Sequence, residues 1–129
     1  MMSKSIADLV GKPFRYGARG PDAYDCYGLC KEIYRRRGIT LPNFPSSEEV
    51  EINRMSMEVG KSFFQRIDAP AAFCIVAFMI RPPYTSHVGI VLPDLAHFMH
   101  VMEQTSVTIE RLDGLLWTRR ITGYYEWKN

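Results

Sequence analysis

The period of the apolar residues changes partway along the chain, and this change limits the possible folds more than any other feature. From Asp25 to Gly38 the less polar positions follow a helical spacing, at positions 26, 29, 30, 33 and 34. From Ala69 onward they follow the shorter period of strands, over residues 71–80, 86–92, 96–102, 107–112 and 122–127. Helices followed by strands are typical of α+β proteins. We therefore expect N-terminal helices packed on an antiparallel sheet of about five strands.

The helix that begins near Asp25 has clear signals at both of its ends. The Asp25 side chain can cap the free amide groups of the first turn, and Gly38 can end the helix. Three arginines at positions 35–37 fall in the last turn, where positive charge interacts favourably with the helix dipole. This placement puts Cys26 in the first turn, on the face that packs inward.

Two more helices are expected before the strands. Residues 5–10 can form a short helix, and residues 11–25 are expected to form an ordered loop because they are rich in Gly and aromatic side chains. Ser46 and Glu49 resemble a capping box, which opens a helix that should continue to about residue 65.

The composition and charge indicate one packed domain and exclude two classes of partner. The chain has 129 residues, of which 47% are hydrophobic and 23% charged, so residues 1–129 are expected to form a single domain. The net charge of +2, with no basic run longer than three arginines, does not suit a nucleic-acid partner. The longest apolar run, residues 69–80, is too short to span a bilayer, so no membrane span is expected.

The three cysteines argue against both a disulfide framework and a metal site. An odd count, at positions 26, 30 and 74, does not suit paired cysteines in a small secreted domain. The spacing of Cys26 and Cys30 has no matching Cys or His pair elsewhere at the distances of a zinc finger. We therefore expect no structural zinc.

Cys26 is the first candidate for chemistry, because a cysteine at the start of a helix is in a position to react. The free amide groups and the helix dipole stabilise a thiolate there, and a neighbouring imidazolium can lower the pKa of a thiol by several units from its usual value of about 8.5. The same amide groups can hold the oxyanion of a tetrahedral intermediate. The alternative is that Cys26 is a small buried apolar residue, and position alone does not decide between the two.

The histidines favour the reactive alternative. If the hairpin of residues 86–102 turns symmetrically about Pro93 and Asp94, His87 lies opposite His100, and opposed residues share a face of the sheet. A loop of two or four residues gives this pairing, whereas a loop of three does not. One histidine would then be a base and the other its orienting partner, although both could be ordinary strand residues. His97 falls on the opposite face and is given no catalytic role.

Several segments together resemble the NlpC-type cell-wall peptidases. They cover the chain from about residue 10 to residue 127, and the pieces around Cys26 and His87 are fairly specific in this order and at this distance. The segments are Gly11-Lys12-Pro13-Phe14-Arg15-Tyr16-Gly17, Tyr24-Asp25-Cys26-Tyr27-Gly28-Leu29, Ser86-His87-Val88-Gly89-Ile90, Phe98-Met99-His100-Val101, and Trp117 with Ile121-Thr122-Gly123-Tyr124-Tyr125.

The resemblance implies a papain-like core with a Cys, His, His triad and no metal or organic cofactor. Carried over residue by residue, Cys26 is the nucleophile, His87 the base, and His100 the residue that orients the base. The implied substrate is a peptidoglycan stem peptide, often cut between D-glutamate and a diamino acid.

Three further residues are candidates for substrate binding. Asp25 lies beside the nucleophile and can contact a substrate amine, although a role as a plain helix cap is the favoured alternative. Ser86 lies beside the base and can line the cleft or have a structural role. The family frequently has Tyr where Phe14 stands, and that hydroxyl assists the oxyanion site. Tyr16 can substitute for it, although a packing role is the alternative.

Two other departures from the family's pattern concern partners and the edge of the cleft. The residue after the nucleophile is often Ser in the family and is Tyr27 here, which looks like the branch associated with phage tails. Residues 69–72 replace the usual Pro-Gly-Asp turn before the central strand. We therefore expect phage-tail proteins as partners beside peptidoglycan.

The N-terminal residues 1–14 contain no apolar core long enough for a signal peptide. The chain is thus expected to be made in the cytoplasm and to act in a virion or at the cell wall after delivery. Two other classes of function fit the same residues: an acyltransferase or amidase on the same scaffold, and a catalytically silent domain that binds the cell wall or serves in tail assembly.

Overall fold

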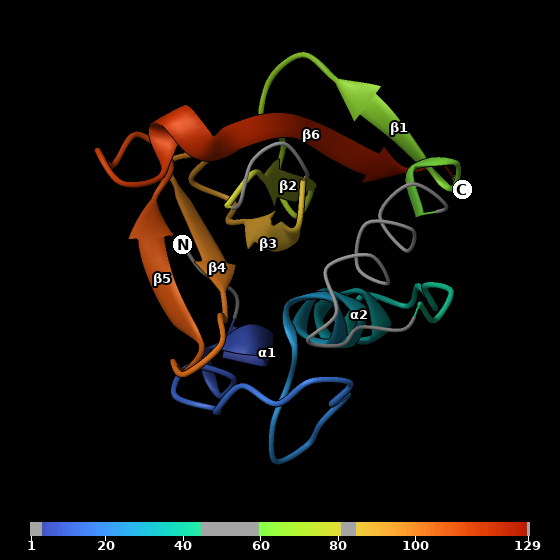
Figure 1. Cartoon of the computed structure of the whole chain (residues 1–129). Helices are drawn as coiled ribbons and strands as arrows, with labels where there is room; N and C mark the ends of the chain where they lie inside the picture. Colours follow the sequence, from blue (N-terminus) through green and yellow to red (C-terminus); the bar gives the residue numbers. More distant parts are fainter. Residues whose placement is uncertain (1–3, 45–59, 81–84, 129) are drawn as a thin grey trace.

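The computed structural model describes residues 4–44, 60–80 and 85–128, which form one antiparallel sheet and one main helix (Figure 1). The sheet has six strands in the order β1-β6-β2-β3-β4-β5. The α+β class is therefore confirmed. The elements are α1 (Lys4–Ala7), α2 (Cys26–Arg36), β1 (Phe64–Ile67), β2 (Ile75–Phe78), β3 (His87–Val91), β4 (His97–His100), β5 (Thr108–Arg111), the 3-10 helix η1 (Thr118–Arg120) and β6 (Ile121–Trp127).

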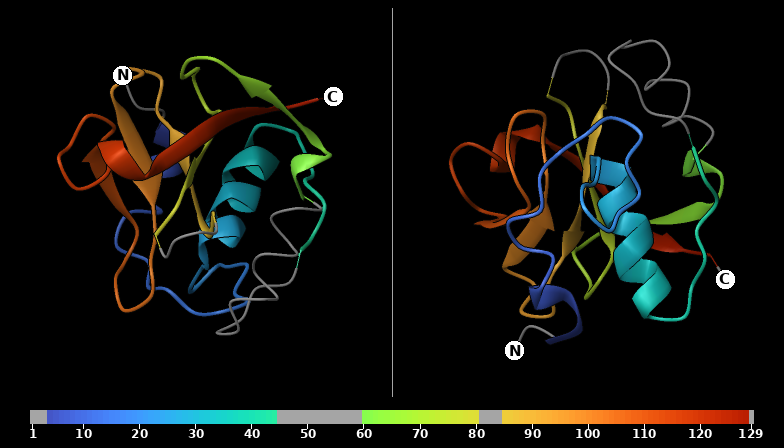
Figure 2. Two further views of the ribbon diagram at one scale, coloured as in Figure 1. Left: turned by 45° about the horizontal axis from the view of Figure 1, so that its top comes forward. Right: turned by 90° about the horizontal axis from the view of Figure 1, so that it is seen from below.

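Helix α2 forms where the sequence predicts it and lies beside β3 (Figure 2). Asp25 caps its start by accepting a hydrogen bond from the backbone N–H of Gly28 at 2.6 Å. Its buried face includes Leu29 and Ile33, which have no exposed surface. Burial of side chains of this size stabilises a fold by about 1.5–3 kcal/mol each, so this face holds the helix against the sheet.

The core has two clusters, one on each face of the sheet. Successive residues of β2 point to opposite faces, so Ile75 joins the cluster that contains α2, whereas Val76 joins the other. The second cluster also contains Phe78, Phe98 and Trp117. The site described below lies where residues of both clusters meet the beginning of β3.

The sheet has six strands rather than about five, because the expected second helix does not continue to residue 65. Residues 45–59 of that expected helix lie outside the described residues. Beyond them, β1 pairs with β6 from Phe64 opposite Trp127 to Ile67 opposite Tyr124. The Phe64 ring is buried and meets the Trp127 ring edge-on at 5.4 Å, which favours a strand over a last turn of helix.

The predicted register of the hairpin between β3 and β4 is wrong by two residues. Ile90 pairs with Met99, and the turn is centred on Asp94 and Leu95 instead of Pro93 and Asp94. The Asp94 carboxylate accepts hydrogen bonds from the backbone N–H groups of Ala96 and His97, at 2.9 and 3.0 Å, and Leu95 adopts a positive φ of 61°. A shift of two residues preserves the face on which each side chain lies.

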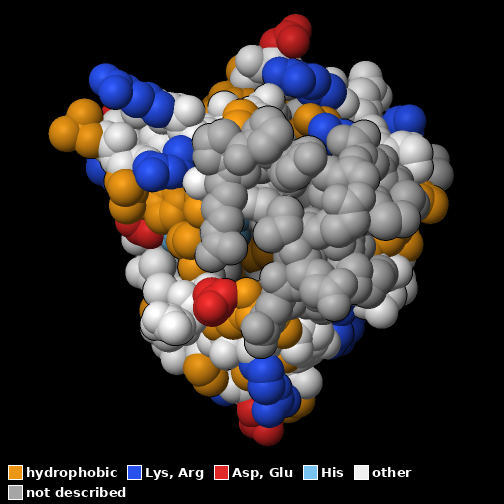
Figure 3. Space-filling model, viewed as in Figure 1, with side chains coloured by type: hydrophobic (Ala, Val, Ile, Leu, Met, Phe, Trp, Pro, Cys, Tyr) orange, Lys and Arg blue, Asp and Glu red, His pale blue; other side chains and the backbone are white. Residues whose placement is uncertain are grey.

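The surface of the described residues agrees with the small net charge. On the face drawn in Figure 3, Lys and Arg side chains lie in separate groups near the rim. Among the helices in the described part of the chain, none is long and apolar enough to cross a membrane.

Candidate active site

Cys26 is the first residue of α2, as the sequence predicts, and its side chain is partly buried. The helix start that carries it is held by Asp25, whose side chain is 1% exposed. Besides capping Gly28, the Asp25 carboxylate accepts hydrogen bonds from the Gly17 backbone at 3.1 Å and from the Arg19 guanidinium at 2.6 Å. The expected cap is therefore confirmed, and a contact of Asp25 with substrate stays a prediction.

The surroundings of the Cys26 sulfur favour the neutral thiol, which corrects the expectation of a thiolate. Burial raises the pKa of the Cys26 thiol to about 11, and the negative charge of Asp25 acts in the same direction. The nearby backbone N–H groups of Val88 and Tyr27, and the charge of Arg19, lower the pKa but do not outweigh burial. At neutral pH the resting protein therefore carries a thiol at this position.

His87 and His100 lie in direct contact, as the sequence predicts. The Nε2 atom of His87 is 2.8 Å from the Nδ1 atom of His100, and the two side chains are 5% and 2% exposed. The contact survives the shift in register because both side chains stay on one face of the sheet. Gly89 lies on this face between them: a Cβ atom added there would be 3.1 Å from the Cβ of His100. The absence of a side chain at Gly89 lets the two rings meet diagonally.

Both histidines are held in their neutral forms. Burial lowers the pKa of His87 well below its usual value, and a positive charge on His100 would act in the same direction. Burial also lowers the pKa of His100, although the carboxylate of Glu110 opposes this shift. A neutral imidazole can accept a proton from a thiol, which an imidazolium cannot do.

Glu110 completes the row of polar contacts, and it is not among the residues that the sequence predicts for the site. Its Oε2 atom is 2.6 Å from the Nε2 atom of His100. The register of β4 and β5 pairs His100 with Thr108 and Phe98 with Glu110, which places all four residues on one face. The alternation in residues 107–112 was the available signal, because polar residues at 108 and 110 alternate with apolar residues at 107 and 109.

Aromatic rings enclose the two histidines on the face of the second cluster. The Trp117 ring meets the His100 ring edge-on at 4.7 Å and lies 6.1 Å from the His87 ring. The Phe78 ring lies 5.4 Å from the His87 ring. The Trp117 Nε1 atom is buried and has no hydrogen-bond partner among the described residues. These rings keep water from the histidines and account for the lowered pKa values.

The Cys26 sulfur lies near the backbone at the beginning of β3. The sulfur lies near the backbone N–H of Val88, which directly follows His87 in the chain. Within the described ranges, no hydrogen bond joins the sulfur to the His87 ring. The contact with His100 uses the Nε2 atom of His87, so the other ring nitrogen, Nδ1, is not part of that contact.

The other predicted residues lie around this centre in different ways. The Tyr16 hydroxyl donates to the carboxylate of Glu103, and its ring meets Phe14 edge-on at 4.9 Å, which agrees with the packing alternative. Ser86 directly precedes His87, and its backbone N–H donates to the carbonyl of Phe78 at 3.0 Å. Roles of Tyr16 and Ser86 toward substrate stay predictions.

His97 lies apart from this centre, as expected. Its Nδ1 atom is 2.6 Å from the Asp94 carboxylate in the turn. Among the described residues, no group of three or more His, Cys, Asp or Glu side chains could hold a metal ion.

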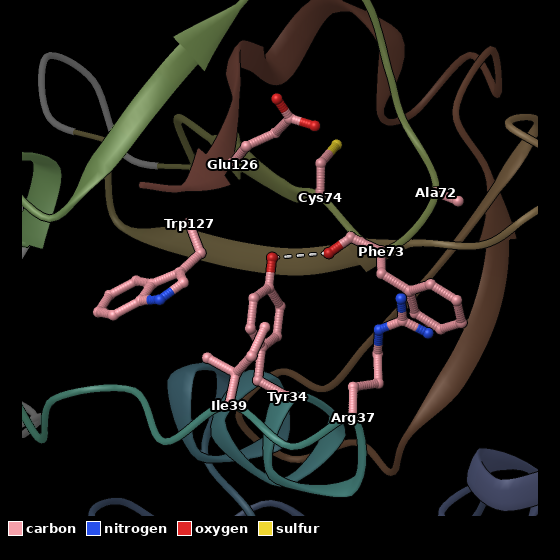
Figure 4. Close-up of a pocket in the computed structure, with 8 residues that line it drawn as sticks. All are labelled: Tyr34, Arg37, Ile39, Ala72, Phe73, Cys74, Glu126 and Trp127. Atoms are coloured by element: carbon pink, nitrogen blue, oxygen red, sulfur yellow. Dashed lines mark hydrogen bonds between the residues drawn. The ribbon is translucent and has the colours of Figure 1, made fainter. Parts of the chain in front are cut away.

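A pocket of about 250 Å³ lies near the C-terminal end of α2 (Figure 4). Cys26 is the first residue of that helix. Its wall includes Tyr34, whose hydroxyl donates to the Phe73 carbonyl at 2.7 Å, and Arg37, whose guanidinium lies 3.8 Å over the Phe73 ring. None of the predicted site residues lines this pocket, so it is separate from the Cys26 centre.

Comparisons of sequence with known proteins point to one family. A sequence model described as the NlpC/P60 family matches residues 11–126. A relative from Listeria innocua, named probable endopeptidase p60, is 31% identical over 52 residues, which are 40% of this chain and 11% of that protein. The relative of the same name from Listeria grayi is 24% identical over 115 residues, which are 89% of this chain and 20% of that protein. The chain thus spans a fifth or less of these relatives.

Solved structures show the same fold at low sequence identity. A protein from Staphylococcus aureus, described as similar to a lipoprotein of the NLP/P60 family, matches with a TM-score of 0.70 and 21% identity, over 95% of this chain and 38% of that one. An NlpC/P60 family protein from Bacillus cereus matches with a TM-score of 0.72 and 17% identity, over 94% and 37% of the two chains. The NlpC/p60 domain of the peptidoglycan hydrolase SagA matches with a TM-score of 0.59 and 16% identity, over 95% and 91%.

Proposed function

Because the chain belongs to the NlpC/P60 family, we propose that it is a cysteine peptidase that hydrolyses peptide bonds in peptidoglycan stem peptides. The observation that carries the proposal is the meeting of three features at the beginning of β3. Cys26 opens a helix there, its sulfur lies near the Val88 amide, and the preceding residue, His87, contacts His100 at 2.8 Å. The names of the relatives, probable endopeptidase and peptidoglycan hydrolase, support the class of substrate.

The neutral resting state determines how the reaction begins. The Nδ1 atom of His87 takes the thiol proton while the sulfur of Cys26 attacks the scissile carbonyl carbon. Amide groups at the start of α2 stabilise the oxyanion that forms. As the tetrahedral intermediate collapses, His87 gives the proton to the leaving amine and an acyl-enzyme remains. Water then attacks the carbonyl carbon of the acyl-enzyme and gives a proton to His87. As the C–S bond breaks, His87 returns this proton to the sulfur, which releases the acid and restores the Cys26 thiol.

The first test is digestion of purified peptidoglycan by the wild type and by Cys26→Ala, with mass spectrometry of the released fragments. We expect fragments from the wild type and none from Cys26→Ala, because no other described group can take the place of the sulfur. Cys74→Ala is the matched control, since Cys74 is buried and lines the pocket near the C-terminal end of α2, whereas Cys26 opens that helix. Digestion by Cys26→Ala at the wild-type rate would refute the assignment of the nucleophile.

The same fragments identify the bond that is cut. We propose cleavage between D-glutamate and the following diamino acid, which the resemblance of residues 24–29 and 86–90 to the family supports. A free amine on the diamino acid and a free carboxyl group on the D-glutamate are the expected products. Products joined to an added amine instead would support the acyltransferase alternative.

A finer proposal concerns the branch of the family and the place of action. Tyr27, whose hydroxyl donates to the Pro42 carbonyl at 2.6 Å, follows the nucleophile where Ser is frequent. On this feature we propose that the chain is made in the cytoplasm and acts at the cell wall after delivery by a phage tail. Mass spectrometry of purified virions from a producing strain tests this proposal. Peptides of this chain should be found in the tail fraction, and their absence from virions would refute it.

A further inference from the structure

The contacts that begin at the catalytic pair continue to a carboxylate on β5. His87 Nε2 lies 2.8 Å from His100 Nδ1, and His100 Nε2 lies 2.6 Å from Glu110 Oε2. We propose that Glu110 is a positioning residue that sets the tautomers of both histidines, so that the Nδ1 atom of His87 is the unprotonated base. This inference rests on the proposed function, because it assigns a role in the same reaction.

The direction of the hydrogen bonds follows from the chemistry of the groups. A carboxylate only accepts hydrogen bonds, so the Nε2 atom of His100 must carry a proton. His100 is neutral, so its Nδ1 atom has a lone pair and accepts from the Nε2–H of His87. His87 is also neutral, which leaves its own Nδ1 atom without a proton. The carboxylate thus determines where the proton of each ring lies.

The opposite arrangement of protons would block the reaction. Without an acceptor at Glu110, His100 could carry its proton on Nδ1 and donate to the Nε2 atom of His87. His87 would then hold its proton on Nδ1, the atom that must receive the proton of the Cys26 thiol. A histidine in the wrong tautomer cannot act as the base, even when its position is unchanged.

The surroundings of His100 leave Glu110 as the group that can make this selection. The neighbours that face the His100 ring are His87 from β3, Glu110 from β5, Phe98 from its own strand and Trp117 from the segment after β5. Phe98 and Trp117 offer no acceptor. The side chain of Glu110 is 35% exposed, so its carboxylate remains solvated on one side while it contacts a buried ring on the other.

The charge of Glu110 has a second effect on the same ring. It raises the pKa of His100 and so opposes the burial that lowers it. When His87 takes the thiol proton, the positive charge that forms lies one ring away from this carboxylate. Glu110 therefore stabilises the positive charge that forms on His87, and it also sets the direction of the hydrogen bonds between the two histidines.

Two substitutions separate the two effects. Glu110→Gln keeps a carbonyl oxygen that can accept from His100 but removes the charge. Glu110→Leu removes both the acceptor and the charge, and the half-exposed position on β5 tolerates an apolar side chain. Asp94→Asn is the matched control, because Asp94 contacts His97 at 2.6 Å outside the site.

The tautomers are measured by NMR of protein with 15N-labelled histidine, and the hydrolysis of a synthetic stem peptide is measured beside them. In the wild type and in Asp94→Asn, we expect His100 and His87 to carry their protons on Nε2. In Glu110→Leu we expect mixed tautomers for both rings and little change in KM. We expect kcat to be lower by about 10- to 100-fold, by analogy with the loss of a hydrogen-bond partner that orients a metal-bound histidine. In Glu110→Gln we expect unchanged tautomers and a His100 titration that moves to lower pH.

Wild-type tautomers together with wild-type kcat in Glu110→Leu would overturn the proposal. If Glu110→Leu does not fold, Glu110→Ala, which also removes the acceptor, is measured in its place, and wild-type tautomers there would overturn the proposal. The NMR readout needs no substrate, so it decides the role of Glu110 even if the wild type fails to cleave a stem peptide. Such a failure would refute the proposed function and not the assignment of the tautomers.

Discussion

At the scale of single residues, the acidity of Cys26 is decided by two opposing influences. The start of α2 offers free amide groups that favour a thiolate, whereas burial and the charge of Asp25 favour the thiol. Burial is the larger influence, and it raises the pKa of the thiol to about 11. The base must therefore act during the attack, because no stored thiolate is present beforehand.

This balance predicts the pH dependence of alkylation at Cys26. Iodoacetamide reacts with the thiolate, so the rate of modification should still be rising between pH 8 and pH 10. The rate is followed by mass spectrometry of the peptide that contains Cys26. Cys30 and Cys74, both buried, serve as internal controls that should react more slowly. A rate that is already constant from pH 6 upward would show instead a thiolate paired with an imidazolium.

At the scale of elements, the β3–β4 hairpin shows why the sequence predicts a contact more securely than a register. The alternation of residues 86–102 depends only on the period of a strand, so it places His87 and His100 on one face and His97 on the other. The register depends on the turn, where Asp94 accepts two backbone hydrogen bonds and Leu95 adopts a positive φ. A turn of four residues with an Asp in this role is not evident from the apolar pattern.

Gly89 in β3 leaves little room for a side chain. We therefore predict that even the substitution of Ala for Gly89 destabilises the fold. A Cβ atom there would lie 3.0 Å from the Met99 carbonyl oxygen and 3.1 Å from the His100 Cβ. Gly89→Ala should therefore lower the free energy of unfolding by about 1–3 kcal/mol, the usual cost of overpacking. Urea unfolding measures this change. Gly60→Ala is the control, because its Cβ would meet Phe44 at an ordinary 3.6 Å, and an equal effect of the two variants would contradict the packing argument.

At the scale of the whole molecule, local signals predict the parts of the fold that local physics determines. The cap at Asp25, the buried face of α2 and the strands β2 to β5 follow from residues close together in the chain. Strand β1 does not, because its partner β6 lies far along the sequence and the segment before β1 has a capping-box pattern. Glu110 was missed for a related reason: its role depends on the register between β4 and β5.

The buried histidine pair predicts how the stability of the whole molecule depends on pH. The pKa values of His87 and His100 lie below the usual value of about 6.5 in the folded protein, so the unfolded chain binds protons more readily below that pH. The free energy of unfolding should therefore fall as the pH decreases from 7.5 to 5.5. Urea midpoints at the two pH values measure this difference.

Variants of single histidines identify the source of that dependence. His87→Gln removes a buried neutral imidazole, so the difference between the two urea midpoints should shrink. His97→Gln should not shrink the difference, because His97 lies beside the Asp94 carboxylate in the turn, outside the buried pair. Equal midpoints of the wild type at pH 5.5 and 7.5 would contradict the prediction.

The position of β6 between β1 and β2 has a consequence for the order in which the chain folds. Strands β2, β3, β4 and β5 are neighbours both in sequence and in the sheet, so their pairing closes only short loops. Strand β1 has β6 as its only neighbour in the described sheet. Its residue Phe64 pairs with Trp127, and the chain between these two residues contains β2, β3, β4 and β5, so the pairing closes a long stretch of chain. Closing that loop costs more conformational entropy, which slows the step. We expect the hairpins that carry both histidines to form early in folding, and β6 to be inserted beside β2 and joined by β1 last.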